Sequence, residues 1–214
     1  MTHDSIGLGE DGPTHQPIET LVLTRATPNM LTFRPADGNE VSGTYLAAIE
    51  DQHRPSVIAL SRQNLPQLEG SSIEAVRRGG YILQNPENAQ LILVATGSEV
   101  SLAVDAAKEL AAQGIATRVV SMPCSELYDE QPEEYRKSVL SPGIPIVSIE
   151  ALGVTGWERY SHAQVGMRSF GASAPIKQLY NKFDITVEAT IAKSKKVIEY
   201  YQKAGYVPEV GLNF

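Results

Sequence analysis

Short apolar runs alternate with longer amphipathic segments through the second half of the chain. The runs are typical of buried strands, and apolar residues that recur every three or four positions are typical of helices. Strands and helices that alternate in this way predict an α/β fold with right-handed crossovers and a mostly parallel sheet. The expected strands are Tyr81 to Leu83, Leu91 to Ala95, Ala116 to Ser121 and Ile144 to Ile149; the expected helices are Val100 to Ala112, a short one within Tyr128 to Val139, and one from Ile185 to about Ala204.

The first half of the chain predicts fewer elements. Asp37 is expected to cap a helix, because Glu40 follows it at the spacing of a capping box. The apolar residues at helical spacing within that helix are Val41, Tyr45, Ala48 and Ile49. The other expected elements are a short helix over Ile18 to Arg25, a strand from Met30 to Phe33 and a buried strand from Ser56 to Leu60.

A polar segment from Pro66 to Ser72, with a glycine and paired serines, separates the two halves. This composition is typical of a linker. We therefore expect one domain over residues 1–72 and a second over residues 73–214. The second has about 140 residues, which is a comfortable size for a domain that folds alone.

Charge and composition exclude several classes of protein. The chain has 214 residues and a net charge of −7 without clusters of Lys and Arg, so we expect no nucleic-acid partner. No apolar run is long enough to span a bilayer and no signal peptide is recognisable, so we expect no membrane association. Cys124 is the single cysteine, which excludes an internal disulfide and a cysteine-based metal site and fits a cytoplasmic setting.

The stretch from Thr2 to Pro17 has the highest density of candidate chemistry. It is a turn-rich loop with almost no hydrophobic residues, and we do not expect it to join the core. His3 and His15, with Asp11 between them, could act as metal ligands, as acid–base groups or as contacts to hydroxyls and phosphates. They could equally belong to a solvated loop whose polar groups only satisfy turns. A metal site is the weakest of these hypotheses, because the histidine spacing is wrong and no cysteine takes part.

Two further positions are candidates for anion binding. Arg62 follows an expected strand, where it could pair with a carboxylate or clamp a phosphate. The turn Thr96-Gly97-Ser98-Glu99 joins a strand to a helix and could offer backbone N–H groups to an anion. It lacks the glycine pattern of a phosphate loop, so helix capping by Ser98 is the favoured interpretation.

The other residues of chemical interest carry weaker expectations. Glu150, at the expected end of a strand, and Trp157 could line an interface, although packing is the commoner role of a tryptophan. His53 and His162 are expected on the surface or in loops. Cys124 is expected to be unreactive, because no neighbour in sequence would lower its pKa.

The sixteen residues T-H-D-S-I-G-L-G-E-D-G-P-T-H-Q-P closely resemble a motif from the middle of the transketolase family, which are thiamine-diphosphate enzymes of the pentose phosphate pathway. The resemblance continues in the same order over essentially the whole chain. The matching motifs are R-P-A-D-G-N-E at Arg34 to Glu40, S-R-Q at Ser61 to Gln63, A-T-G-S-E-V at Ala95 to Val100 and F-G-A-S-A-P at Phe170 to Pro175.

This resemblance implies a domain organisation. Residues 1–72 resemble the end of the pyrimidine-binding α/β domain, and residues 73–214 resemble the entire three-layer C-terminal α/β domain. The family's cofactor-binding domain and the glutamate that activates the aminopyrimidine have no counterpart in this chain. The resemblance therefore implies no metal-binding or cofactor-anchoring residue here, and a chain that is inactive alone.

The resemblance also implies a reaction and the roles of four residues. Transketolases transfer a two-carbon ketol unit from a ketose phosphate to an aldose phosphate, using thiamine diphosphate and a Mg or Ca ion. His3 and Arg62 match the residues that contact the sugar phosphate group. Asp11 matches the residue that hydrogen-bonds a substrate hydroxyl and selects stereochemistry, and His15 matches the catalytic histidine beside the reacting carbonyl.

Two other functions remain as alternatives. Dihydroxyacetone synthase shares much of the pattern, and acceptor choice also depends on residues outside this chain. A non-catalytic dimerisation or regulatory module is the alternative from a different class. The expected partners are sugar phosphates and either a second copy of the chain or a partner chain that carries the cofactor domain.

Overall fold

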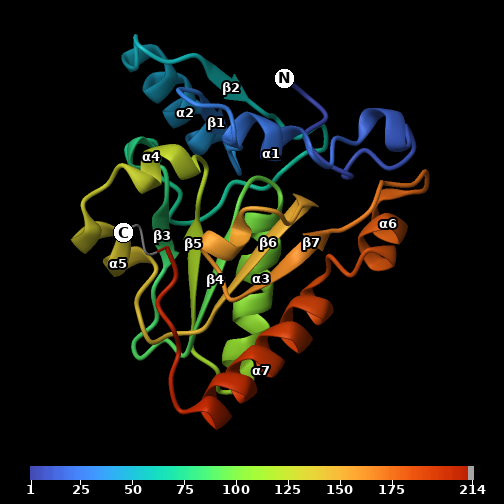
Figure 1. The fold of residues 1–214 in the computed structure, drawn as a ribbon. Helices are drawn as coiled ribbons and strands as arrows, with labels where there is room; N and C mark the ends of the chain where they lie inside the picture. The colour runs from blue at the N-terminus through green and yellow to red at the C-terminus, as the bar shows by residue number, and fades with distance from the viewer. Residues whose placement is uncertain (212–214) are drawn as a thin grey trace.

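The larger of two sheets is built from the second half of the chain, as the alternating pattern predicts (Figure 1). The structure, a computed structural model, describes residues 1–211. The five strands lie in the order β3-β5-β4-β6-β7, and all neighbours are parallel except β3 and β5. The strands are β3 (Tyr81–Gln84), β4 (Leu91–Ala95), β5 (Thr117–Ser121), β6 (Ile146–Gly153) and β7 (Ala163–Met167).

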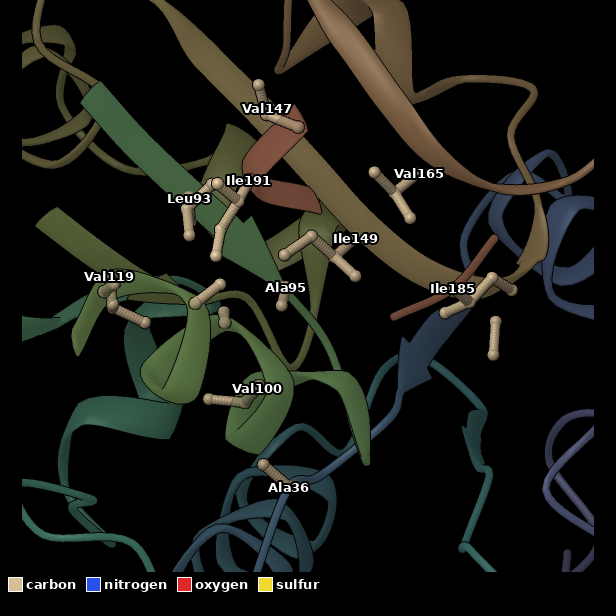
Figure 2. Packing of buried hydrophobic residues seen from close by; sticks show 14 of the residues in the cluster. Ala36, Leu93, Ala95, Val100, Val119, Val147, Ile149, Val165, Ile185 and Ile191 are labelled. Atoms are coloured by element: carbon tan, nitrogen blue, oxygen red, sulfur yellow. The ribbon is translucent and has the colours of Figure 1, made fainter. Parts of the chain in front are cut away.

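Helices cover both faces of this sheet and make a three-layer domain. Central strand β4 is buried along its whole length, and its side chains alternate between the two faces. Leu93 joins the core under α3 and α7, where Figure 2 shows it near Ile191, whereas Ile92 joins the core on the side of α4 and α5. The helices are α3 (Glu99–Ala112), α4 (Ser125–Asp129), α5 (Glu133–Val139), α6 (Ile176–Lys182) and α7 (Val187–Ala204).

The first half forms a smaller group of strands and helices, which lies along the top of Figure 1. Strands β1 (Leu31–Phe33) and β2 (Ser56–Ile58) pair in parallel, accompanied by α1 (Thr20–Arg25) and α2 (Gly38–Glu50). The strand expected over Ser56 to Leu60 is found as β2, but β2 is only half-buried, and the expected burial holds at Ala59 alone of the neighbouring residues. The apolar run from Val57 to Leu60 is typical of a buried strand, but a run this short does not determine how much of it other elements cover.

Helix α2 begins as predicted but buries an unexpected face. Asp37 accepts a hydrogen bond from the Glu40 backbone N–H (2.9 Å), which confirms the predicted cap. The apolar residues Tyr45 and Ile49 are 50% and 71% exposed. The buried face instead carries small or polar residues, namely Glu40, Gly43, Thr44 and Ala47. Close packing of small side chains, rather than an apolar stripe, therefore orients α2.

Several elements of the second half differ from the sequence prediction. Strand β7 and helices α4 and α6 were not predicted, whereas α5 is the short helix expected within Tyr128 to Val139. Strand β6 continues to Gly153, so Glu150 lies inside the strand and not at its end. Both Glu150 and Trp157 are buried, which places them in packing and not on an exposed interface.

Arg34 is a fully buried cation that joins the first half of the chain to the larger sheet. It follows β1 directly, and its Nε donates to Asp4 Oδ2 of the opening loop at 2.8 Å. On the other side, one terminal nitrogen donates to Glu99 Oε2 of α3 at 2.5 Å and to the Thr96 carbonyl at 2.9 Å. A buried guanidinium is tolerated only when such partners satisfy it, because removing the charge from water costs several kcal/mol.

The turn between β4 and α3 encloses this guanidinium. Ser98 occupies the N-cap position of α3, but its side chain does not cap the helix, so that prediction was wrong. Its hydroxyl donates to Glu99 Oε1 (2.7 Å) and accepts from Arg34 (3.2 Å). Gly97 has φ +52°, and a Cβ there would lie 2.7 Å from Arg34 Cζ. The turn therefore receives a cation from the chain itself rather than an external phosphate.

Glu150 forms a second buried charge pair beside the first. Two nitrogens of Arg25 in α1 donate to its oxygens at 2.9 and 2.7 Å, and Trp157 Nε1 donates at 2.7 Å. Burial alone would raise the pKa of Glu150, but the charges of Arg25 and Arg34 outweigh it and hold the pKa at about 2. Glu150 is therefore ionised and fixes α1 against β6.

Cys124 and His162 have structural roles, whereas His53 is a surface residue. Cys124 is buried, and burial raises its pKa well above the usual range, in agreement with an unreactive thiol. His53 is exposed, as expected. His162 lies in the loop before β7, as expected, where its Nδ1 accepts the Ile146 N–H and its Nε2 donates to the Pro208 carbonyl, both at 2.9 Å. Across residues 1–211, no helix has the length and apolarity needed to cross a bilayer.

Replacing Gly97 with alanine should destabilise the protein more than the same change at Gly114. Both glycines have positive φ, at +52° and +80°, which costs alanine about 1–2 kcal/mol. Only Gly97 lies against Arg34, whereas a Cβ at Gly114 meets no atom within 4 Å. Urea unfolding should show a further loss of about 1–3 kcal/mol for Gly97→Ala. Equal losses in the two variants would contradict the role given to Arg34.

The neutral state of His162 should make stability sensitive to pH. Burial lowers its pKa below 6.5, and protonation would remove the Nδ1 acceptor of the Ile146 N–H. A depressed histidine pKa stabilises the fold above the unfolded value and loses that contribution as the pH falls below it. The urea midpoint of the wild type should therefore fall more between about pH 7.5 and 5 than that of His162→Gln. His53→Gln is the control and should follow the wild type.

Candidate functional site

Three polar side chains of the opening loop meet on one surface of the first half. His3 Nε2 lies 3.8 Å from Asp11 Oδ2, and the rings of His3 and His15 are 5.9 Å apart between centroids, at an interplanar angle of 56°. The His3 side chain is 27% exposed and that of Asp11 is 48% exposed, and His15 is also exposed. The loop thus presents two imidazoles and a carboxylate to solvent together.

The opening loop is anchored in the core, contrary to the expectation from its composition. Ile6 is fully buried within the large core cluster of the second half, and Asp4 and Ser5 are buried beside it. A single apolar residue is enough to anchor this loop, because the flanking polar residues find hydrogen-bond partners. His3 has φ +63°, a conformation that non-glycine residues adopt at a cost. The buried neighbours hold it there.

The far end of the loop is attached to the segment F-G-A-S-A-P. Gln16 is buried; its amide nitrogen donates to the Ala172 carbonyl (3.0 Å) and its oxygen accepts the Ala172 N–H (3.1 Å). The Ala174 N–H donates to the Gly9 carbonyl at 3.1 Å. A Cβ on Gly9 would lie 2.0 Å from the Ala174 carbonyl oxygen, so the two segments can approach this closely only with glycine there.

Arg62 lies in the segment that runs beside the start of the loop. A parallel bridge pairs Thr2 with Leu60, and Ser61 Oγ donates to Asp4 Oδ2 at 3.0 Å. The Arg62 side chain is exposed. Over residues 1–211 it takes part in no ion pair, so the interpretation of Arg62 as a strand-end partner of a carboxylate finds no support.

This arrangement is suited to binding a polar, anionic small molecule. The Arg62 guanidinium and two imidazoles are donors for phosphate oxygens, and Asp11 is an acceptor for hydroxyls. Among the residues that the structure describes, no group of three or more His, Cys, Asp and Glu side chains could hold a metal ion. The geometry of these side chains therefore suits polar contacts to a ligand.

Sequence reasoning missed the residues that hold the site in place. The sequence assigns no role of their own to Arg34 and Gln16, yet each is buried and hydrogen-bonded to a distant segment. A charged residue directly after an apolar strand and before a proline, as in F-R-P, is the signal that could have identified Arg34. No local signal identifies Gln16, because its partner Ala172 lies 156 residues away.

Family comparisons match most of the chain to two domains. The transketolase-like C-terminal domain matches residues 79–186, and the transketolase pyrimidine-binding domain matches residues 1–67. The expected domain boundary after residue 72 lies between the two matched ranges and stays a prediction. The first of these matches alone covers half of the chain.

Individual relatives extend the same likeness. Transketolase 1 of Candida albicans is 56% identical over 201 residues, which are 94% of this chain and 30% of that protein. A transketolase from Pichia stipitis, solved in complex with sedoheptulose 7-phosphate, superposes with a TM-score of 0.95 at 53% identity, covering 100% of this chain and 32% of that one. A split-gene transketolase, described as an inactive β4 tetramer, superposes with a TM-score of 0.72 at 26% identity, over 89% of this chain and 65% of that one.

The likeness covers nearly all of this chain but only part of each relative. The chain spans about 30% of the length of the curated relatives that it matches, and within that part it shares their fold throughout. The motifs quoted from the sequence all lie in the superposed region, since the superposition with the Pichia stipitis protein covers the entire chain. The chain therefore belongs to the transketolase family.

Proposed function

We propose that this chain forms part of a thiamine-diphosphate-dependent transketolase, which transfers a two-carbon ketol unit from a ketose phosphate to an aldose phosphate. The observation that carries the proposal is the meeting of His3, Asp11 and His15 on one exposed surface. Membership of the transketolase family supports it, as does the sugar phosphate complex of the Pichia stipitis relative. In this proposal the reaction belongs to the pentose phosphate pathway.

His3 and Arg62 bind the phosphate group of the substrate in this proposal. A guanidinium can donate two parallel hydrogen bonds to phosphate oxygens, and an imidazole can add a third. The bridge between Thr2 and Leu60 supports this pairing, because it keeps the two segments side by side. The phosphate would fix the far end of the sugar and so orient its reactive end.

Asp11 and His15 contact the sugar itself. Asp11 accepts a hydrogen bond from one substrate hydroxyl, and a carboxylate at a fixed position favours the sugar whose hydroxyl has the matching configuration. His15 is the catalytic residue, positioned beside the reacting carbonyl, where its ring can donate to or accept from the C1 hydroxyl or carbonyl oxygen. The 5.9 Å between the centroids of its ring and that of His3 supports contact of both side chains with one ligand.

The described residues do not fit the complete cofactor site. Among residues 1–211, no group of three or more His, Cys, Asp and Glu side chains could hold a Mg or Ca ion. Thiamine diphosphate, when bound, stabilises negative charge on the carbon of the transferred unit. We propose that thiamine diphosphate is held by domains that correspond to the remaining part of the transketolase relatives, outside the 30% that this chain matches.

The likeness to the split-gene transketolase supports one alternative, in which this chain is a separate subunit or a non-catalytic module. That protein is described as an inactive β4 tetramer, and 89% of this chain superposes on 65% of it. A chain of this kind would act in the cytoplasm as a homodimer or as the partner of a chain that carries the cofactor domain. Without such a partner, it would be a non-catalytic module. No structural feature favours dihydroxyacetone synthase.

A chimeric enzyme tests the proposal directly. In this chimera, the chain replaces the matching third of the Pichia stipitis transketolase. The replacement is feasible because the superposition covers 100% of this chain and 32% of that protein at 53% identity. The chimera should transfer ketol units from sedoheptulose 7-phosphate. His3→Ala and Arg62→Ala should each lower the ratio of kcat/KM for sedoheptulose 7-phosphate to that for sedoheptulose by about tenfold or more, because each removes a charged hydrogen bond to phosphate.

Matched variants control for general damage. His53 is exposed and lies outside the loop, and Arg77 is paired with Glu50 and Glu74. His53→Ala and Arg77→Ala should leave the ratio unchanged within about twofold, since surface substitutions have small effects. An inactive chimera that is folded and binds thiamine diphosphate would refute the proposed function. An unchanged ratio in His3→Ala and Arg62→Ala would refute the roles of those two residues.

A further inference from the structure

Asp4 connects the two residues that bind phosphate in the proposed function. It directly follows His3, and its Oδ2 accepts a hydrogen bond from Ser61 Oγ at 3.0 Å, directly before Arg62. A single carboxylate oxygen therefore links the backbone that carries His3 to the backbone that carries Arg62. The distance between the two phosphate-binding side chains depends on where this carboxylate is held.

Arg34 holds the Asp4 carboxylate in place. Arg34 Nε donates to the same oxygen at 2.8 Å, and the two side chains are 0% and 1% exposed. Such a pair is not screened by water and has a fixed geometry. The left-handed φ of His3, +63°, is a strained conformation that persists only when its surroundings determine it. The adjacent Asp4–Arg34 pair supplies that constraint.

Arg34 is in turn held by α3 through Glu99. Glu99 Oε2 accepts from Arg34 at 2.5 Å and from the Ala151 N–H of β6 at 2.9 Å. Its other oxygen accepts from Tyr180 of α6 at 2.9 Å. Glu99, itself in α3, is thus fixed by two other elements of the larger sheet's domain, β6 and α6. The contacts run without interruption from that sheet, through Glu99 and Arg34, to Asp4.

We propose that Arg34 and Glu99 are positioning residues that set the spacing of His3 and Arg62, so that the domain of the larger sheet controls the preference for phosphorylated sugars. The inference rests on the proposed phosphate contacts of His3 and Arg62. Neither Arg34 nor Glu99 touches the substrate, because both are fully buried. They act through Asp4, and a shift of about 1 Å in such a positioning contact can cost about 100-fold in rate.

The test is Glu99→Gln in the chimeric enzyme. The amide keeps the shape of the side chain but loses the charge that holds Arg34, so the Asp4 carboxylate and the adjoining backbone can move. The ratio of kcat/KM for sedoheptulose 7-phosphate to that for sedoheptulose should fall by about tenfold. The kcat/KM for sedoheptulose should change by less than about threefold, because the contacts of Asp11 and His15 are left in place.

Glu40→Gln is the matched control, and Arg34→Lys is a second test variant. Glu40 is another fully buried carboxylate, but it binds Ser121, Tyr81 and the Ala36 N–H and does not contact Arg34. Its variant should keep the wild-type ratio within about twofold. A lysine at position 34 lacks the planar fork that reaches both carboxylates, so Arg34→Lys should lower the ratio in the same direction as Glu99→Gln.

The outcomes separate this inference from the proposed function. If the chimera is active and His3→Ala and Arg62→Ala lower the ratio while Glu99→Gln and Arg34→Lys do not, the positioning inference is overturned alone. A loss of kcat/KM that is equal for both sugars would also overturn it, since a purely structural role predicts that result. If His3→Ala and Arg62→Ala leave the ratio unchanged, the proposed phosphate contacts are refuted first.

Discussion

One buried cation determines how the two parts of this chain fit together. Arg34 has no exposed surface, and it needs the carboxylates of Asp4 and Glu99 to compensate its charge. Those carboxylates come from the opening loop and from α3, so neither part can move without leaving a buried charge unpaired. Apolar contacts alone would allow the two parts to slide, whereas the hydrogen bonds of an arginine guanidinium are directional as well as strong.

The motifs that identify the family divide into side chains that face solvent and side chains that hold them. In the opening loop, His3, Asp11 and His15 are at least partly exposed, whereas Asp4 and Gln16 are buried. The segments T-G-S-E and F-G-A-S-A-P lie far away in sequence, yet they hold the two ends of this loop through Arg34 and through Gln16. The loop is therefore shaped mainly by the domain that follows it.

The sequence predicts the larger sheet well, because strands such as β4 are continuous apolar runs. It misses β7, whose residues A-Q-V-G-M include polar and small side chains. It indicates the wrong face of α2, because small residues rather than Tyr45 and Ile49 are buried. The approach of His3 to His15 and the pairing of Arg34 with Glu99 are tertiary contacts, so no local pattern reveals them. The roles of His3, Asp11, His15 and Arg62 stay proposals based on resemblance.

The charge of Arg34 couples the opening loop to α3. A double-mutant cycle of Arg34→Met and Glu99→Gln, measured by urea unfolding, tests it most directly. Each single variant leaves a buried charge without one of its partners, and the double variant removes both charges of the Arg34–Glu99 pair. The double variant should therefore be more stable than the sum of the single losses predicts, by about 1–3 kcal/mol. Single losses that add to the double loss within about 0.5 kcal/mol would contradict the coupling through Arg34.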